Sequence, residues 1–273
     1  MDAFPGDPVI GEEGADDLRT ESGQPFLDQV VAECRNAGLE GTAEEVCEWI
    51  DRGGLQEYRD RFWTLDPIDG TKGFLRKDQY AISLALVVDG EIEVGILGCP
   101  NMQSTPNDPN SPKGIIAWAM RDRGSFYLPI DQEDVTAKIL RVSTTSDTSA
   151  AKFCESVESG HSSHSWSGQI AESLQITKEP FRIDSQCKYL AVAMGEADIY
   201  LRLPTRPGYI EKIWDHAGGI LIVQEAGGTV TDICGKSIEL THGATLDANE
   251  GMIVTNGQFH DKVVSAVTER RPA

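Results

Sequence analysis

The chain has 273 residues, of which 40% are hydrophobic and 25% charged, a composition typical of a globular protein with one large or two modest domains. Its 44 acidic and 24 basic residues give a net charge of −20 at pH 7. This charge argues against nucleic acid and anionic membranes as partners, which need a basic surface, but leaves small anionic substrates open because bound metal ions can reverse a local field.

The chain starts with a short apolar strand that ends in acidic residues. Pro8-Val9-Ile10 is followed directly by Gly11-Glu12-Glu13. Adjacent acids at a strand end can simply be solvated. They can also supply the additional carboxylate that a site for two or three metal ions needs.

Residues 14–60 are acidic and polar, and they contain two helical patterns. The first runs over Pro25–Arg35 with apolar residues on one face. The second begins at the capping box Thr42-Ala-Glu-Glu45 and continues into an apolar pattern. We interpret this stretch as a solvated helical insertion.

A strand then ends in the motif Asp66-Pro-Ile-Asp69-Gly70-Thr71. Two carboxylates three residues apart suit Mg²⁺, which prefers oxygen ligands and shares them with substrate phosphates. Backbone N–H groups at the start of a following helix suit the phosphate itself. Taken alone, D-P-x-D-G is also a good turn sequence.

Two hairpins predict an antiparallel sheet in the first half. The segments 81–88 and 91–98 flank Asp89-Gly90, a strong hairpin signal, and 115–120 and 125–128 flank a second turn. After about residue 140, helices and strands alternate, which favours a layered α/β half. The elements predicted there are a strand starting at Val142, a helix over 165–174, a strand over 182–184, a helix over 186–194, a strand over 198–203 and a helix over 213–226 that Gly227-Gly228 ends.

Three further groups in the second half are candidates for a site. Asp215 stands where it can cap a helix or offer an oxygen to a metal. His161 and His164 belong to a Gly-His-Ser-Ser-His stretch that is either a polar loop or part of a site. Lys188 and Arg202 bring cations into an acidic protein, where they can form salt bridges or bind a second phosphate.

Cysteine usage and the first residues indicate a cytoplasmic location. The six cysteines include no C-x-x-C pair, which favours reduced core thiols over disulfides or a zinc site. The start carries no basic or apolar targeting segment, and the longest apolar run, 81–88, is too short to cross a bilayer.

Several motifs spread over the chain from residue 9 onward match one family. They are the acidic pair, FWTLDPIDGTKGFLR, GILGCPNM, GHSSH, DSQCKY, YLRLP and EKIWDHAGG. The chain resembles the 3′(2′),5′-bisphosphate nucleotidases, a group within the lithium-sensitive, Mg²⁺-dependent phosphatases that include inositol monophosphatase. The resemblance implies an α/β (α+β) protein with the layered αβαβα sugar-phosphatase fold, in which an antiparallel-sheet half precedes a mixed-sheet α/β half. It implies an N-terminal metal-binding half over 1–140, with the insertion at 14–60, and a nucleotide-binding half over 141–273.

The resemblance also implies the role of individual residues. The metal ligands it implies are Glu12, Asp66, the Ile68 carbonyl, Asp69 and Asp215. The catalytic residues it implies are Glu12, Asp66, Asp69 and Thr71, with Thr71 orienting the attacking water. The substrate contacts it implies are Gly70, Thr71, His161, Ser185, Lys188, Arg202 and Asp215.

The implied reaction is hydrolysis of the 3′-phosphate of adenosine 3′,5′-bisphosphate, and of 3′-phosphoadenylyl sulfate, with two or three Mg²⁺ ions. The expected partner is a small nucleotide bisphosphate, with no nucleic acid or membrane, and a monomer is favoured over an oligomer. Family members carry a helical segment before the first strand, whereas here that strand begins near Met1. A truncated gene model or a shortened protein can explain this start, and either predicts an exposed apolar sheet face. The alternatives are an inositol polyphosphate 1-phosphatase-like enzyme and a weakly active or inactive nucleotide-binding homologue.

Overall fold

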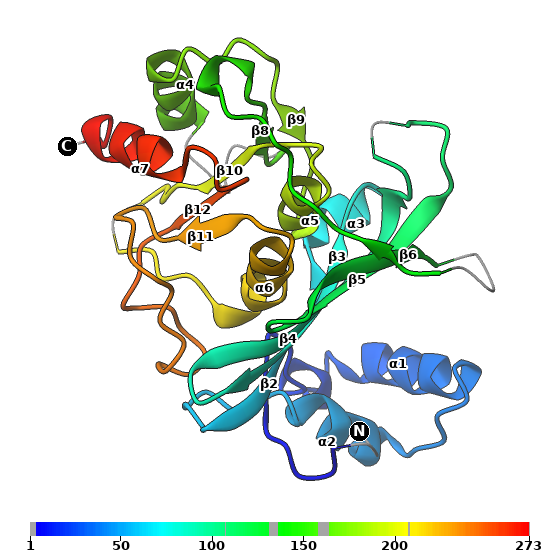
Figure 1. The fold of residues 1–273 in the computed structure, drawn as a ribbon. Helices are drawn as coiled ribbons and strands as arrows, with labels where there is room; N and C mark the ends of the chain where they lie inside the picture. Colours follow the sequence, from blue (N-terminus) through cyan, green and yellow to red (C-terminus); the bar gives the residue numbers. More distant parts are fainter. Residues whose placement is uncertain (1–3, 107, 131–135, 158–163, 207, 273) are drawn as a thin grey trace.

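The computed structural model describes residues 4–106, 108–130, 136–157, 164–206 and 208–272. Within these residues two sheets and the helices packed on them form a mixed α/β protein (Figure 1). The six cysteines all lie in the described part and are free thiols. No helix of the described residues is long and apolar enough to cross a membrane.

The first sheet has seven strands that lie in chain order. They are β1 (Val9–Gly11), β2 (Arg61–Asp69), β3 (Ala81–Val88), β4 (Glu91–Gln103), β5 (Lys113–Met120), β6 (Gly124–Pro129) and β7 (Lys138–Ile139). Both predicted hairpins are present, β3–β4 and β5–β6. In the first turn Asp89 and Gly90 have φ angles of 50° and 80°, the left-handed values that a type I′ hairpin requires.

The prediction of an antiparallel sheet is wrong for β1, which pairs with β2 in parallel. Ile10 lies opposite Thr64 and Gly11 opposite Leu65. The Glu12 N–H donates to the Leu65 carbonyl at 3.2 Å. Parallel pairing brings the carboxyl ends of both strands to one edge, so Glu12, just after β1, lies beside Asp66 near the end of β2.

The second sheet has five strands in the order β11-β12-β10-β8-β9. They are β8 (Phe153–Glu155), β9 (Phe181–Arg182), β10 (Ile199–Arg202), β11 (Thr229–Thr231) and β12 (Met252–Thr255). It is mixed, because β10 pairs in parallel with β8 and antiparallel with β12. The strand predicted at 182–184 therefore lies slightly upstream, at Phe181–Arg182. Val142 is not in a strand, and its N–H instead donates to the Ala226 carbonyl.

Two helices lie between the sheets, and two cover the outer face of the second sheet (Figure 1). The inner pair is α5 (Cys187–Ala193) and α6 (Ala217–Glu225), and the outer pair is α4 (His164–Ser173) and α7 (His260–Glu269). The helix predicted over 213–226 is interrupted: a 3₁₀ turn, η3 (Ile213–Asp215), precedes α6, and His216 between them has a φ of −137°.

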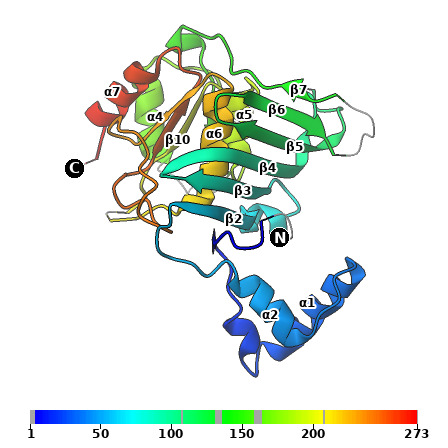
Figure 2. The ribbon, with the colours of Figure 1, turned by 60° about the horizontal axis from the view of Figure 1, so that its bottom comes forward.

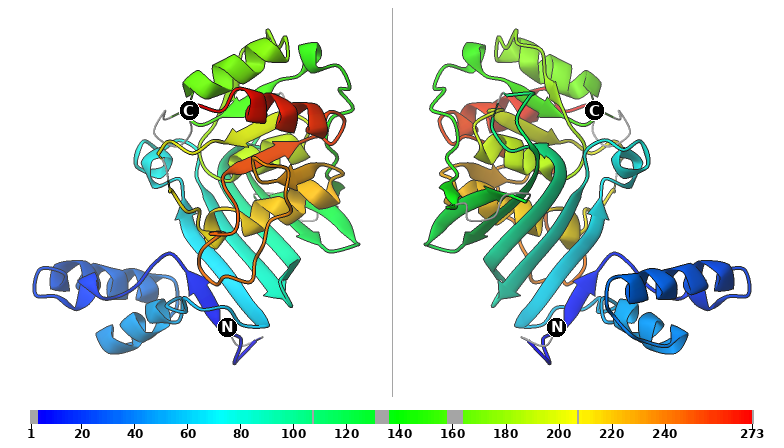
Figure 3. Two further views of the ribbon diagram at one scale, coloured as in Figure 1. Left: turned by 90° about the vertical axis from the view of Figure 1, so that its left-hand side faces the viewer. Right: turned by 90° about the vertical axis from the view of Figure 1, so that its right-hand side faces the viewer.

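The predicted insertion is helical and projects from the body of the protein (Figures 2 and 3). It contains α1 (Gln24–Asn36) and α2 (Ala43–Asp51), with a short 3₁₀ turn, η1 (Asp17–Arg19), before them. The predicted capping box is present: Thr42 Oγ1 accepts from the Glu45 N–H at 3.3 Å, and Glu45 Oε2 accepts from the Thr42 N–H at 2.7 Å. The lobe has a small core of its own, formed by Ala15, Leu27, Val31, Val46 and Cys47.

The face of the first sheet opposite α6 carries no helix among the described residues (Figure 3, right). Large apolar side chains on it are exposed, with Ile82 and Met120 43% and Ile116 38% accessible. The exposed apolar sheet face expected from the sequence is therefore present in the structure.

Close packing of α6 on the first sheet depends on a glycine in β4. A Cβ built on Gly95 would lie 2.6 Å from the Gly218 carbonyl oxygen, a backbone atom that cannot rotate away. We expect Gly95→Ala to lower the free energy of unfolding by about 2–3 kcal/mol, the cost of overpacking a buried contact. Urea unfolding followed by circular dichroism measures it.

Gly168 in α4 is the matched control, because a Cβ there meets nothing within 4 Å. Gly168→Ala removes an exposed helical glycine and should raise stability by roughly 1 kcal/mol. Equal effects of the two substitutions would contradict the close approach of β4 and α6.

Candidate active site

The predicted acidic motif lies where β2 ends and α3 (Thr71–Leu75) begins. The Ile68 N–H donates to Asp66 Oδ1 at 3.0 Å, and β2 continues to Asp69 with a register shift against β3 between Asp66 and Asp69, so the motif forms an irregular strand end and not the turn that D-P-x-D-G alone would allow. Gly70 has a φ of 84°, a left-handed conformation that favours glycine. A Cβ on Gly70 would also lie 2.8 Å from Ser185 Cβ, so glycine lets the two loops approach.

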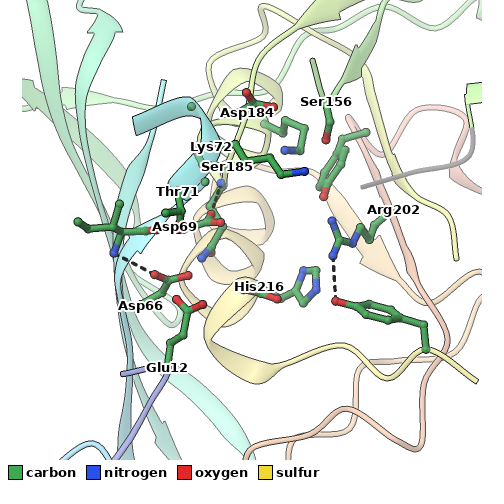
Figure 4. A pocket seen from close by; sticks show the side chains of 18 residues that line it. Glu12, Asp66, Asp69, Thr71, Lys72, Ser156, Asp184, Ser185, Arg202 and His216 are labelled. Atoms are coloured by element: carbon green, nitrogen blue, oxygen red, sulfur yellow. Dashed lines mark hydrogen bonds between the residues drawn. The ribbon is translucent and has the colours of Figure 1, made fainter. Parts of the chain in front are cut away.

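Four carboxylates meet here, and Figure 4 shows three of them, Glu12, Asp66 and Asp69. Oxygens of Asp66, Asp69 and Asp215 all lie within 4.8 Å of one another. Glu12, at the end of β1, hydrogen-bonds to Asp66. Glu12, Asp66 and Asp69 come from the first sheet, whereas Asp215 comes from the η3 turn before α6.

These carboxylates carry strongly perturbed pKa values. Burial, reinforced by the charges of Asp69 and Glu12, raises the pKa of Asp66 to about 10. Burial also raises the pKa of Asp215 to about 7, against the opposing effect of His216. The cluster therefore holds several acids in a position where their ionised forms repel one another. A group of buried carboxylate oxygens with this excess of negative charge fits hard divalent cations.

The neighbours of the cluster also fit a metal site. Ile68 lines the same cavity, and its carbonyl accepts from Thr71 Oγ1 at 3.3 Å. Asp215 does not cap α6: the N-cap residue is His216, which makes no side-chain capping hydrogen bond. The alternative role of Asp215 as a helix cap is therefore wrong, and its carboxylate faces the other acids.

Without metal, the repulsion in this cluster should weaken the fold. The folded-state pKa of Asp66 lies above its unfolded value, so the folded protein binds the extra proton between about pH 4 and pH 10, and stability falls as pH rises across that window. In EDTA at pH 8, Asp66→Asn should raise the free energy of unfolding by about 2 kcal/mol or more. At pH 5 the gain should shrink, because the stability lost to the shifted pKa accumulates with each pH unit above the unfolded value, and pH 5 lies only about one unit above it.

Thermal unfolding in EDTA and in excess Mg²⁺ measures this effect. Mg²⁺ should stabilise the parent protein and stabilise Asp66→Asn much less. A variant that is less stable than the parent in EDTA at pH 8 would contradict the account.

Cationic side chains face the same cavity. Lys188 on α5 is buried, and burial lowers its pKa against the opposing charge of Asp69. Arg202 at the end of β10 forms an ion pair with Glu211, with 2.9 Å between Nε and Oε1. Glu211 also accepts from His216 Nε2 at 3.2 Å, so it stays ionised and its pKa is lowered to about 2. The salt-bridge alternative is therefore confirmed for Arg202, which still lines the cavity.

One residue that the sequence analysis missed connects the two acid-bearing segments. The Gln186 N–H donates to Asp69 Oδ2. Its side chain donates to the Trp214 carbonyl at 2.8 Å and accepts from the Gly219 N–H at 3.1 Å. Gln186 stands in the DSQCKY stretch, but no local pattern distinguishes a buried bridging amide from a surface one.

The cavity between the sheets has a volume of about 310 Å³. The predicted residues that line it are Glu12, Asp66, Ile68, Asp69, Gly70, Thr71, Ser185, Lys188, Arg202 and Asp215. Residues that line it and were not predicted include Lys72, Ser156, Asp184, Tyr200, Tyr209 and His216. His161 lies outside the described residues, so its contact with a nucleotide stays a prediction.

Comparison with known proteins places this geometry in a family. The model of the inositol monophosphatase family matches residues 1–271. The 3′(2′),5′-bisphosphate nucleotidase of Schizosaccharomyces pombe is 44% identical over 99% of this chain and 80% of its own length. The enzyme of the same name from Emericella nidulans is 39% identical over 97% of this chain and 82% of its own length.

Solved structures agree on the fold. The Thermotoga maritima IMPase has a TM-score of 0.61 at 23% identity and covers 98% of this chain and 77% of its own. Mycobacterium tuberculosis SuhB has a TM-score of 0.60 at 18% identity and covers 99% of this chain and 79% of its own. The predicted mixed α/β fold class is thereby confirmed.

Proposed function

Because the chain belongs to the inositol monophosphatase family, we propose that it is a Mg²⁺-dependent phosphatase that converts adenosine 3′,5′-bisphosphate into AMP and phosphate. 3′-Phosphoadenylyl sulfate is the second proposed substrate, with adenylyl sulfate as product. The observation that carries the proposal is one cavity lined by clustered carboxylates and by Lys188 and Arg202. The names of relatives at 44% and 39% identity support a nucleotide over an inositol polyphosphate.

The proposed metal ligands are the carboxylates of the cluster and one carbonyl: Glu12, Asp66, Ile68, Asp69 and Asp215. The set supports two or three Mg²⁺ ions, since it offers more carboxylates than one ion uses. When bound, Mg²⁺ favours ionisation of the attacking water and offsets negative charge on the phosphoryl group and on the leaving ribose oxygen. Sheet residues and Asp215 both contribute, so the proposed metal-binding half (1–140) is completed by the nucleotide-binding half (141–273).

The residues of the chain hold and orient the reactants. Thr71 donates its hydroxyl proton to the Ile68 carbonyl, which leaves the oxygen as an acceptor that can orient a water molecule. Glu12 lines the same cavity, and its carboxylate is proposed to accept a proton from the attacking water. The N–H groups of Gly70 and Thr71 are proposed to hold the scissile phosphate.

The further contacts proposed to the nucleotide, including its phosphates, are those predicted from the sequence: His161, Ser185, Lys188, Arg202 and Asp215. Ser185 has a φ of 65° and accepts from the Cys187 N–H at 3.2 Å, so its position beside Gly70 is held by local structure. A monomeric state and a cytoplasmic location also remain predictions.

Phosphate release from adenosine 3′,5′-bisphosphate with Mg²⁺, with and without Li⁺, tests the function. We expect turnover, inhibition by Li⁺, loss in EDTA and competition by AMP. Phosphate release from an inositol bisphosphate without competition by AMP would favour the inositol alternative. Tight nucleotide binding without phosphate release from any of these substrates would favour a non-catalytic homologue.

A further inference from the structure

A second cavity adjoins the acid-lined one. It also has a volume of about 310 Å³, and the two cavities share the side chains of Arg202 and Tyr209. Its lining residues are Arg202, Leu203, Pro204, Thr205, Arg206, Tyr209 and Glu211. None of its other residues belongs to the site described above, except Glu211 through its ion pair with Arg202.

The second cavity lies on the side of the site that Arg202 and Tyr209 form, and its wall includes Glu211, whose carboxylate lies within 4.8 Å of the Asp215 carboxylate. Figure 4 shows Arg202 across the cavity from Glu12 and Asp66. In the pose we consider, the scissile phosphate sits at the carboxylates and the nucleotide extends across the cavity toward Arg202 and Tyr209, which also line the outer cavity. In this pose a group attached beyond the second phosphate reaches the outer cavity.

Two guanidinium groups flank this end. The Arg202 and Arg206 guanidinium carbons lie 5.8 Å and 5.2 Å from the centre of the Tyr209 ring, within the range of a cation–π contact. The Arg202 NH2 group also donates to the Tyr209 hydroxyl at 3.4 Å. Tyr209, which lines both cavities, thus contacts both arginines.

The two arginines differ in their charge balance. Arg202 is paired with Glu211, and the second oxygen of Glu211 bonds to His216, so this carboxylate is fully engaged. Arg206 is exposed and forms no ion pair with any residue in the described part of the chain, although the net charge of the protein is −20. An unpaired arginine beside a cavity in so acidic a protein is a ready binding group for an anion.

Resting on the proposed function, we propose that the outer cavity binds an anionic group attached to the 5′-phosphate of the nucleotide. Arg206, held by the Tyr209 ring, is then a specificity-determining residue. It favours substrates with a second acidic group at this end, such as a 5′-phosphosulfate, over substrates that end in a simple 5′-phosphate.

Kinetics of Arg206→Gln test this assignment on two substrates. We expect kcat/KM for 3′-phosphoadenylyl sulfate to fall about tenfold, the value of one charge-assisted contact, while that for adenosine 3′,5′-bisphosphate stays within about twofold. Arg270→Gln is the matched control, since it removes the same charge from an exposed position that lines neither cavity. It should leave both substrates unchanged.

Product binding gives a readout that does not need turnover. By calorimetry, Arg206→Gln should weaken the binding of adenylyl sulfate about tenfold and change the binding of AMP little. Equal losses for both ligands, or no loss for either, would overturn the assignment of Arg206. A parent protein that releases phosphate from neither substrate would instead overturn the proposed function, and the binding comparison would still decide the role of Arg206.

Discussion

Replacing Asp69 by asparagine should lower kcat/KM for adenosine 3′,5′-bisphosphate by at least about 10³-fold. An oxygen of Asp69 lies within 4.8 Å of oxygens of Asp66 and Asp215, and the Asp69 charge opposes the lowering of the Lys188 pKa by burial. An asparagine keeps the shape and an oxygen that can accept from the Gln186 N–H, but it loses the charge that a divalent cation needs. The variant should therefore fold normally and fail to turn over.

The measurement is phosphate release over a range of Mg²⁺ concentrations, with Mg²⁺ binding followed by calorimetry. Asp89→Asn is the matched control, because it makes the same chemical change in the exposed β3–β4 turn. Asn-Gly suits that turn as well as Asp-Gly does, so activity should be unchanged. An unaltered rate in Asp69→Asn would remove Asp69 from the proposed metal site.

Local sequence signals predicted the elements whose structure depends on neighbouring residues. The Asp89-Gly90 hairpin follows from two residues that adopt left-handed conformations, and the capping box at Thr42 from two reciprocal hydrogen bonds. The acids at 66 and 69 were also found locally, because a strand ends there. In each of these cases the interacting groups lie within a few residues of one another.

The parts that were missed depend on contacts between distant segments. The parallel pairing of β1 with β2 joins residues more than fifty positions apart, so no periodicity in either strand reveals it. The strand β11 has only three residues, too few for a pattern, and it exists because it pairs with β12. The break at His216 lies in a segment that reads as continuous helix, and the His216 side chain is held there by Tyr189 on α5 and by Glu211.

The resemblance to a family supplied what the local signals lacked. Glu12 taken alone was as compatible with a solvated surface as with a site, and Asp215 with a helix cap. The structure brings both to Asp66, which agrees with the positions that the resemblance selected. The structure also changes what we expect of Lys188, which the sequence analysis offered as a ligand for a second phosphate. Among its charged neighbours is Asp69, whose negative charge opposes the lowering of the Lys188 pKa by burial.

We therefore expect Lys188→Met to lower kcat/KM for all 3′-phosphorylated substrates, and not only for those with a second phosphate. The Lys188 amine lies 5.3 Å from the centre of the Tyr200 ring, in a buried position beside the acids. Loss of this cation removes attraction for the scissile phosphate, and kcat/KM should fall about 10²-fold on both adenosine 3′,5′-bisphosphate and adenosine 3′-phosphate. Steady-state kinetics on the two substrates measure it, with Lys262→Met, a change at an exposed position, as the control.

The dependence on Mg²⁺ separates this role from a loss of structure. A lysine beside Asp69 repels a nearby cation, so its removal should leave the Mg²⁺ concentration for half-maximal activity unchanged or lower, while KM for the substrate rises. General damage to the site would weaken the binding of Mg²⁺ and the binding of substrate together. A loss confined to the bisphosphate would instead place Lys188 at the second phosphate. That outcome would move the binding site for this group inward from Arg202, toward α5.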